Sequence, residues 1–333
     1  MILSSLPANY SSASENCLFT FSQVDPAQSV GIEIRNASTM AVLGRKRFKG
    51  STTFALDVAA YARRQLSPLP SRSAQTSFFN DSRRTSRLKL SWGDGEVSEE
   101  RTFTPSLADL VRGQLLRTDT LPTEIPLGGR DEISVVTAAG DTLAATILLD
   151  DPFSTQRIVT KQNCPTGITS LAVVASDIVA YSLEQSEVKG FTVTLALNGD
   201  LVGEVVYRLV PDCSERLTVE WLNRKGGFEC HPFEIRSRRR VVLSREVVKK
   251  SESSAAVMTT GAVETLIGSG MQPRERLQTL SDIALSSIVR LIEGGATQSV
   301  TVVDSTPQLI ERDGKAEVVL TVRTVRETTS KIF

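Results

Sequence analysis

The chain has 333 residues, of which 40% are hydrophobic and only 5% aromatic, and its 38 basic residues are balanced by 38 acidic ones. A single core rarely grows past about 250–300 residues, so this length indicates two or three domains, with cores built on aliphatic side chains. The balanced charge argues against a general nucleic-acid or anionic-membrane binder, because such proteins carry a basic excess.

The cellular compartment is predicted from the beginning of the chain and from its cysteines. Residues 1–5 contain neither a basic region nor an apolar run, so no signal peptide is predicted. No apolar stretch approaches the ~18–20 residues of a membrane span. The four cysteines are far apart and lack C-x-x-C spacing: Cys17, Cys164, Cys213 and Cys230. We therefore expect synthesis in a cytoplasm, four free thiols, no metal and no cofactor.

The first third of the chain alternates between polar segments and short apolar ones. Residues 1–16 are Ser-rich and predict an extended arm, and strands are expected at residues 17–21, 30–34 and 40–43. Ser51 to Thr53 can cap a helix over residues 55–66, because Ala55, Val58, Ala59, Ala62 and Leu66 follow a helical period.

Turn residues divide the next segment into strands. Residues 67–86 predict a surface loop, and residues 88–92 and 97–103 predict two strands around Gly93-Asp94-Gly95. One or two helical turns are expected between residues 107 and 116. Residues 133–136 and 143–149 predict a hairpin around Gly140.

The second half shows stronger hairpin signals. Beyond a predicted strand at residues 171–174, Asn198-Gly199 joins strands at residues 191–197 and 202–209. Residues 217–222 alternate as a half-buried strand, and Gly226-Gly227 turns the chain into residues 228–235. This hairpin carries Trp221, one of two tryptophans, so we expect a core to be built on it.

The C-terminal segment predicts one helix among hairpins. A strand is expected at residues 241–243, followed by a small and polar stretch at residues 251–270. Pro273 begins a helix in which Leu277, Leu280 and Ala284 share a face, and which ends near Ser286-Ser287. Hairpins are then expected from residues 288–292 with 300–303, and from residues 309–311 with 318–322.

We therefore predict a mainly β fold with two or three antiparallel β-sandwich-like domains and two short helices. The predicted divisions are an extended arm at 1–16, an N-terminal β domain at 17–150, a central β-sandwich at 151–240, and a helix with β-hairpins at 241–333 that can complete the central domain.

Catalytic chemistry is not predicted at His231, the only histidine. A general base or zinc ligand needs partners, and in a strand Cys230 and His231 point to opposite faces. A structural or surface role is the better interpretation. No catalytic, cofactor-binding or metal-binding residue is predicted, and we expect the protein not to be an enzyme.

Glycine pairs and acidic turns also favour plain structural roles. Gly93-Asp94-Gly95 and Gly226-Gly227 do not open a helix after a strand, and no Walker-type lysine follows them, so turns explain them better than phosphate loops. Asp150-Asp151 and Asp313 lack the calcium-loop pattern and are interpreted as solvated turn carboxylates.

Three basic runs stand out: Arg45-Lys46-Arg47, Arg83-Arg84 and residues 236–240. Such runs are usually solvated faces or charged edge strands. The alternative is that they bind acidic patches on neighbouring subunits, because the chain itself carries equal acidic content.

Several landmarks resemble one family. They are residues 6–11 with Asn16 and residues 18–21, residues 54–58, Trp221-Leu222-Asn223 followed by Gly226-Gly227-Phe228, and the helix from residue 277 toward 292. In this pattern the chain resembles structural proteins of tailed bacteriophages that infect Bacteroidetes-type bacteria. The resemblance implies a virion component of the tail, neck or baseplate, without catalytic residues.

We thus expect a virion structural protein that works through subunit interfaces in a symmetric homo-oligomer, with itself and neighbouring virion proteins as partners. Nucleic acid, membrane and small-molecule substrate are not expected as partners. The alternative is a carbohydrate-binding or adhesin-type β-sandwich, which exposed aromatic platforms would mark.

Overall fold

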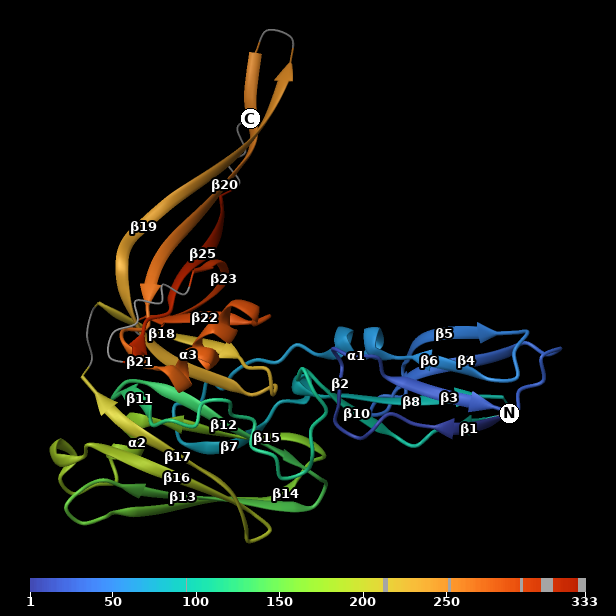
Figure 1. The fold of residues 1–333 in the computed structure, drawn as a ribbon, viewed down its shortest axis with the longest axis horizontal. Helices are drawn as coiled ribbons and strands as arrows, with labels where there is room; N and C mark the ends of the chain where they lie inside the picture. The colour runs from blue at the N-terminus through green and yellow to red at the C-terminus, as the bar shows by residue number, and fades with distance from the viewer. Residues whose placement is uncertain (94, 212–214, 251–252, 294–295, 307–313, 329–333) are drawn as a thin grey trace. The chain divides into compact units, whose positions relative to one another are not determined.

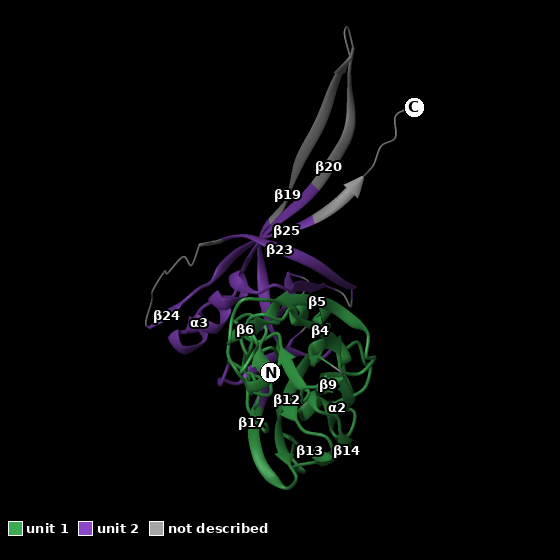
Figure 2. Cartoon of the chain, turned by 90° about the vertical axis from the view of Figure 1, so that its right-hand side faces the viewer, with its two compact units in different colours: residues 1–118, 131–205, 224–228 green, residues 119–130, 206–223, 229–333 purple. Residues whose placement is uncertain are grey.

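The computed structural model describes residues 1–93, 95–211, 215–250, 253–293, 296–306 and 314–328. The chain is mainly β, as predicted (Figure 1). Its contacts define two compact units (Figure 2): unit 1 is residues 1–118, 131–205 and 224–228, and unit 2 is residues 119–130, 206–223 and 229–333. These limits do not coincide with the boundaries predicted at residues 16, 150 and 240.

Unit 1 begins with two sheets that share one core. The first has the order β1 (Ile2–Ser5), β3 (Leu18–Ser22), β6 (Phe54–Asp57). The second has the order β2 (Ser11–Ser12), β10 (Arg101–Thr104), β8 (Ser86–Trp92), β4 (Val30–Asn36), β5 (Val42–Phe48), with β9 (Glu96–Val97) also paired to β8. Alternate residues of these strands, including Phe19, Phe21, Ile32 and Leu90, fill the space between them.

The predicted N-terminal arm is part of this core, which corrects the prediction of an extended arm separate from the N-terminal domain. β1 pairs with β3, and β2 pairs with β10. Tyr10 is buried and donates its hydroxyl to the carbonyl of Thr137 at 2.8 Å. The prediction failed because the segment is anchored by backbone pairing and by one aromatic ring, and neither appears as an apolar run.

The predicted helix at residues 55–66 begins later than expected. Residues 54–57 form β6, and α1 covers Ala59–Gln65. The cap at Ser51 to Thr53 is therefore wrong. Asp57 instead accepts hydrogen bonds from the backbone N–H groups of Cys17 and Ala59, both at 2.9 Å, so one carboxylate joins the strand to the helix start.

The rest of unit 1 consists of two further sheets, which lie as two layers in Figure 1. One has the order β12 (Arg130–Thr137), β15 (Gly167–Val174), β7 (Ser77–Asn80). The other contains β17 (Asp200–Val210), β16 (Gly190–Leu197), β13 (Asp141–Leu149) and β14 (Gln156–Cys164) in this order. The remaining short elements here are α2 (Ala175–Val179), η1 (Ser82–Arg84) and η2 (Gln185–Glu187).

Two local predictions for this region are wrong. β12 and β13 follow each other around Gly140 but belong to different sheets, so they are not a hairpin. No helix forms at residues 107–116, which are described throughout. The backbone there bonds to β12 instead: Leu116 N–H donates to Ser134 at 2.9 Å. The Asn198-Gly199 hairpin of β16 and β17 is confirmed.

Unit 2 is built on a closed barrel with the order β18-β19-β20-β25-β23-β22. The strands are β18 (Arg216–Leu222), β19 (Phe228–Lys250), β20 (Ser253–Gly268), β22 (Val289–Glu293), β23 (Ala296–Thr306) and β25 (Val319–Thr328). Its core includes Trp221, Phe233 and Leu320, so the prediction of a core on the Trp221 hairpin is confirmed. The barrel joins strands from both sides of residue 240.

The other elements of unit 2 are short. They are β11 (Thr123–Pro126), parallel to residues 207–210 of β17, β21 (Gln272–Pro273) paired with β24 (Lys315–Ala316), α3 (Arg274–Ser281) and η3 (Asp282–Leu285). The helix after Pro273 and the hairpin after it are confirmed. The stretch at residues 251–270, which was predicted only as small and polar, is largely β20. Backbone pairing with β19 forms this strand, and its side-chain pattern did not indicate it. The hairpin predicted at residues 309–311 lies outside the described residues.

Candidate functional site

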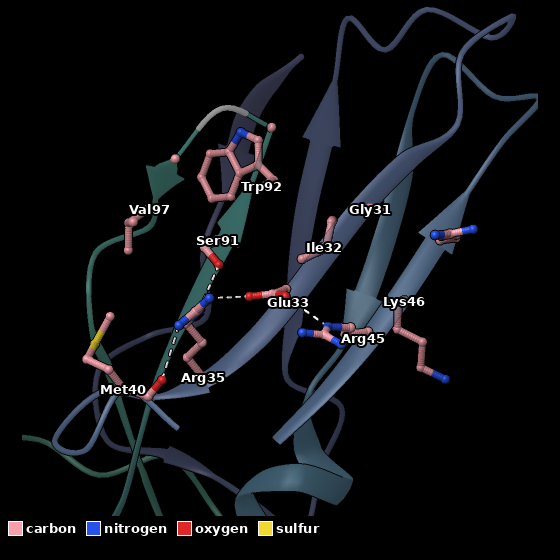
Figure 3. Close-up of a pocket in the computed structure, with 13 residues that line it drawn as sticks. Gly31, Ile32, Glu33, Arg35, Met40, Arg45, Lys46, Ser91, Trp92 and Val97 are labelled. Carbon is pink, nitrogen blue, oxygen red and sulfur yellow. Dashed lines mark hydrogen bonds and ion pairs between the residues drawn. The ribbon is translucent and has the colours of Figure 1, made fainter. Parts of the chain in front are cut away.

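A basic groove lies on the face of β4, β5 and β8 that is turned away from the core. Figure 3 shows it from close by, and its volume is about 650 Å³. We call it the β5 groove. Its lining residues are Gly31, Ile32, Glu33, Arg35, Met40, Arg45, Lys46, Arg47, Ser91, Trp92, Gly93, Gly95 and Val97.

Strand alternation builds the groove. In β4, Ile32 and Ile34 are buried in the core, so Gly31, Glu33 and Arg35 belong to the opposite face. The register places Glu33 directly across from Arg45 of β5 on one side and from Ser91 of β8 on the other. Three strands thus bring their polar side chains to one place.

Glu33 is held between two arginines. The Arg45 Nε donates to one carboxylate oxygen at 2.8 Å, and Arg35 pairs with the other. Arg35 also donates to the Ser91 hydroxyl at 3.1 Å and to the carbonyl of Met40 at 3.2 Å (Figure 3). Hydrogen bonds from Arg45 and Arg35 hold the pKa of Glu33 below its ordinary value, so this carboxylate stays charged.

The groove nevertheless carries an excess of positive charge. Arg35, Arg45 and Arg47 lie on this face together with the single carboxylate of Glu33, and Lys46, opposite Ile32, borders the groove from the other face of β5. Within the described part of the chain, Lys46 and Arg47 enter no salt bridge. A surface of this kind attracts an acidic partner and repels a basic one.

Three lining glycines leave part of the groove without side chains. A Cβ added at Gly31 or Gly93 would meet no atom within 4 Å. Gly93 and Gly95 have φ of +56° and +105°, which favours glycine in this turn. The neighbouring Trp92 is not a binding platform, because its ring packs edge-on against Phe21 at 5.2 Å and belongs to the core.

β5 is the last strand of its sheet, so one row of its backbone N–H and C=O groups has no strand partner among the described residues. Its position is set by α1, because Gly44 lies under the Tyr61 ring and any side chain there would collide with it. The interpretation of residues 45–47 as a charged edge strand is therefore confirmed. The sequence offered Arg45 to Arg47 as a candidate but not Glu33, Arg35 or Ser91, for which alternation in residues 30–36 was the available signal.

In the second basic run, Arg83-Arg84, one arginine is not solvated as predicted. Arg84 is fully buried and pairs with the buried carboxylate of Glu132, its Nη2 donating to Oε2 at 2.8 Å. Its guanidinium lies 5.2 Å from the Phe79 ring centre and 5.0 Å from that of Phe228. This ion pair is part of the core of unit 1.

In the third run, Arg236 donates to Glu317 at 2.6 Å, and the side chains of residues 238–240 are outside the described set. Arg236 also lies 3.3 Å from a Glu234 oxygen. The described part of this run is therefore paired within unit 2.

His231 is buried in unit 2, with 2% of its surface exposed, and its Nε2 has no hydrogen-bond partner in the described structure. Burial and the nearby charge of Arg276 lower its pKa to about 3, so the ring is neutral. The thiol of Cys230 contacts the carbonyl of Arg130 at 3.2 Å. Both residues have packing roles.

The remaining candidates are turn residues. Gly226 has φ of +81°, and Gly227 allows a close approach of the Leu116 carbonyl. Asp151 accepts hydrogen bonds from Thr155, at 2.8 Å from its hydroxyl. Asp313 and Cys213 lie outside the described residues, whereas Cys17, Cys164 and Cys230 are buried and form no disulfide with one another. No group of three or more potential metal ligands occurs in the described part of the chain.

Comparison with protein-family models and with curated proteins found no match. Among the described residues, no helix combines the length and the apolar character needed to cross a membrane.

Proposed function

We propose that the chain is a structural protein of a tailed-phage virion, a component of the tail, neck or baseplate, that assembles through its β5 groove. An acidic strand of a neighbouring copy adds to the open edge of β5, and its carboxylates lie among the basic side chains of the groove. The mechanism is backbone pairing for affinity and charge for selectivity.

The observation that carries this proposal is the coincidence of an open strand edge with unpaired positive charge. Backbone groups at an edge can bind any extended segment, and Lys46 and Arg47 exclude basic or apolar ones. The charge that prevents self-pairing between identical β5 edges therefore also selects an acidic strand. Balanced composition means that another copy can supply it.

A second feature supports assembly. β19 and β20 pair as far as Lys250 and Ser253, whereas β25 pairs with β20 only as far as Thr259 in the described residues. In the described backbone, the stretch beyond is a ribbon of two strands. Such a ribbon is marginally stable alone in water, so contact with a neighbouring subunit would stabilise it.

The virion assignment itself draws on the resemblance of Trp221-Leu222-Asn223 and the glycine pair after it to phage structural proteins. Proteomics of purified phage particles tests it: the chain should be present in a fixed copy number. Its absence from particles, together with saturable binding on a glycan array, would favour the adhesin-type alternative.

The assembly role is tested separately by charge reversal. The variant Arg45→Glu/Lys46→Glu/Arg47→Glu should stay monomeric in sedimentation velocity at low salt, where the wild type associates. At about 1 M salt, where the screening length is about 3 Å, wild-type association should also weaken. The matched control Arg64→Glu/Lys189→Glu/Arg208→Glu changes three exposed cations elsewhere and should associate like the wild type. Equal association of both variants would refute the role of β5.

A further inference from the structure

The closed barrel of unit 2 is filled with side chains at one end and hollow at the other. The hollow end has a volume of about 440 Å³. We call it the barrel cavity. Its lining residues come from all six barrel strands: Leu217, Ile235, Ser237, Val263, Thr265, Leu291, Glu293, Ala296, Gln298, Val322 and Thr324.

The cavity continues the interior of the barrel. Along a strand, inward residues at a spacing of two pass from the core to the cavity lining, as in Leu320, Val322 and Thr324 of β25, where Val322 belongs to both. Phe233 of β19 lies in the core and Ser237 lines the cavity. All these side chains point inward, and they become smaller or more polar toward the hollow end.

A barrel of six strands has room for little besides its own side chains. The space therefore depends on small residues at inward positions, notably Ser237, Ala296 and Thr265. Ser237, Glu293, Ala296 and Gln298 are exposed, so the hollow end opens to solvent and a ligand can enter it, whereas Val322 and Thr324 are buried further inside.

We infer that the barrel cavity is a binding site for a small, neutral and mainly apolar molecule of two or three rings or similar bulk. The volume falls in the range of small-molecule sites, and a cavity of about 150 Å³ already holds benzene. Leu217, Leu291 and Val322 give apolar walls, and hydroxyl groups such as that of Thr265 can bond to a polar substituent. Glu293, the one charged lining residue, disfavours an anion.

This inference concerns unit 2 alone and does not rest on the proposed assembly role. It also goes beyond the expectation from the sequence, which predicted no small-molecule substrate, because a ligand held in a barrel need not be turned over.

Two related fluorescent probes test the site on the full chain. N-phenyl-1-naphthylamine is neutral, and 8-anilino-1-naphthalenesulfonate is its sulfonated analogue. The neutral probe should bind with one site per chain and raise the melting temperature, because a ligand of the folded state stabilises it. The anionic probe should bind at least tenfold more weakly. Absence of saturable binding of the neutral probe, or equal binding of both, would overturn the inference.

Cavity-filling variants locate the binding. Ala296→Leu and, independently, Thr324→Leu place a larger side chain at inward positions, so each should lower affinity for the neutral probe at least tenfold without lowering the melting temperature. The control Thr297→Leu adds the same side chain at the neighbouring position of β23, which does not line the cavity, and should bind like the wild type. Unchanged affinity in a folded inward variant would contradict the assignment. If one inward variant does not fold, the probe affinity of the other variant decides the test.

Discussion

The two units deal with the edges of their sheets in different ways. In unit 2, six strands close into a barrel, so each strand has a neighbour on both sides within the barrel. In unit 1, the sheet that ends in β5 stays open, and its edge carries Arg45, Lys46 and Arg47. Closure removes a surface from interaction, whereas a charged edge stays available to a partner of opposite charge. Under the proposed assembly role, this open edge of unit 1 is the surface that recognises a neighbouring protein, in addition to the β19–β20 ribbon of unit 2.

The largest expected loss of stability comes from the core of the closed barrel. Trp221 has only 2% of its surface exposed and lies in the barrel core. Trp221→Ala should cost about 3–5 kcal/mol of unfolding free energy. Urea denaturation measures it, with Leu201→Ala as a control, since that side chain is 73% exposed and should cost under about 0.5 kcal/mol. A loss below about 1 kcal/mol for Trp221→Ala would mean that the barrel does not depend on this ring.

Unit 1 contains an ion pair in which both side chains are almost fully buried, Arg84 with Glu132. Arg84→Met leaves Glu132 buried without its cation and should destabilise the protein by about 3–5 kcal/mol. Arg84→Met/Glu132→Gln removes both charges and should recover much of this loss, because no buried charge stays uncompensated. Denaturation curves of the two variants give the comparison. A double variant less stable than the single one would contradict this account.

The N-terminal segment is expected to matter nearly as much. Tyr10→Ala removes a buried ring and its hydrogen bond to Thr137, so we expect a loss of about 2–4 kcal/mol. Tyr181→Ala is the matched control, because that tyrosine is half exposed. Thermal unfolding distinguishes them. Equal melting temperatures would restore the idea of an arm outside the core.

A smaller effect should depend on pH. The pKa of His231 is about 3 in the folded chain, below its ordinary value of 6.5, because of burial and Arg276. The unfolded chain therefore binds the proton first as pH falls. The stabilisation is complete above pH 6.5 and decreases below it, by about 1.4 kcal/mol per pH unit until the folded pKa is reached. Urea denaturation at pH 7.5 and 5.5 should show this difference, and His231→Gln should remove it. The same pH dependence in both proteins would exclude His231 as its origin.

The sequence predicted features whose cause is local and missed those that depend on distant partners. Asn198-Gly199 and Pro273 act on adjacent residues, and the elements they mark were found. β20 and the segment around Tyr10 are held by strands far along the chain, so their own side chains did not reveal them. The barrel could not be predicted either, because closure depends on the pairing of strands separated by many residues.

The candidate site shows the same limit. The run at residues 45–47 was visible as a charged strand, but Glu33 and Ser91 join it only through strand register. Arg84, beside Arg83 in the sequence, was expected to be solvated. Its burial follows from Glu132, which is 48 residues away. Runs of like charge therefore predict where charge occurs, and the three-dimensional pairing decides which charges stay available.

Hydrogen exchange of β5 tests the central claim most directly. In the isolated chain, the backbone N–H groups of Val42–Phe48 that face away from β4 should exchange rapidly, because they have no strand partner in the described structure. In purified particles, or in the oligomer formed at low salt, the same groups should exchange at least tenfold more slowly, while those of β18 in the closed barrel should not change. Unchanged exchange across Val42–Phe48 in the assembled state would contradict assembly through the β5 groove.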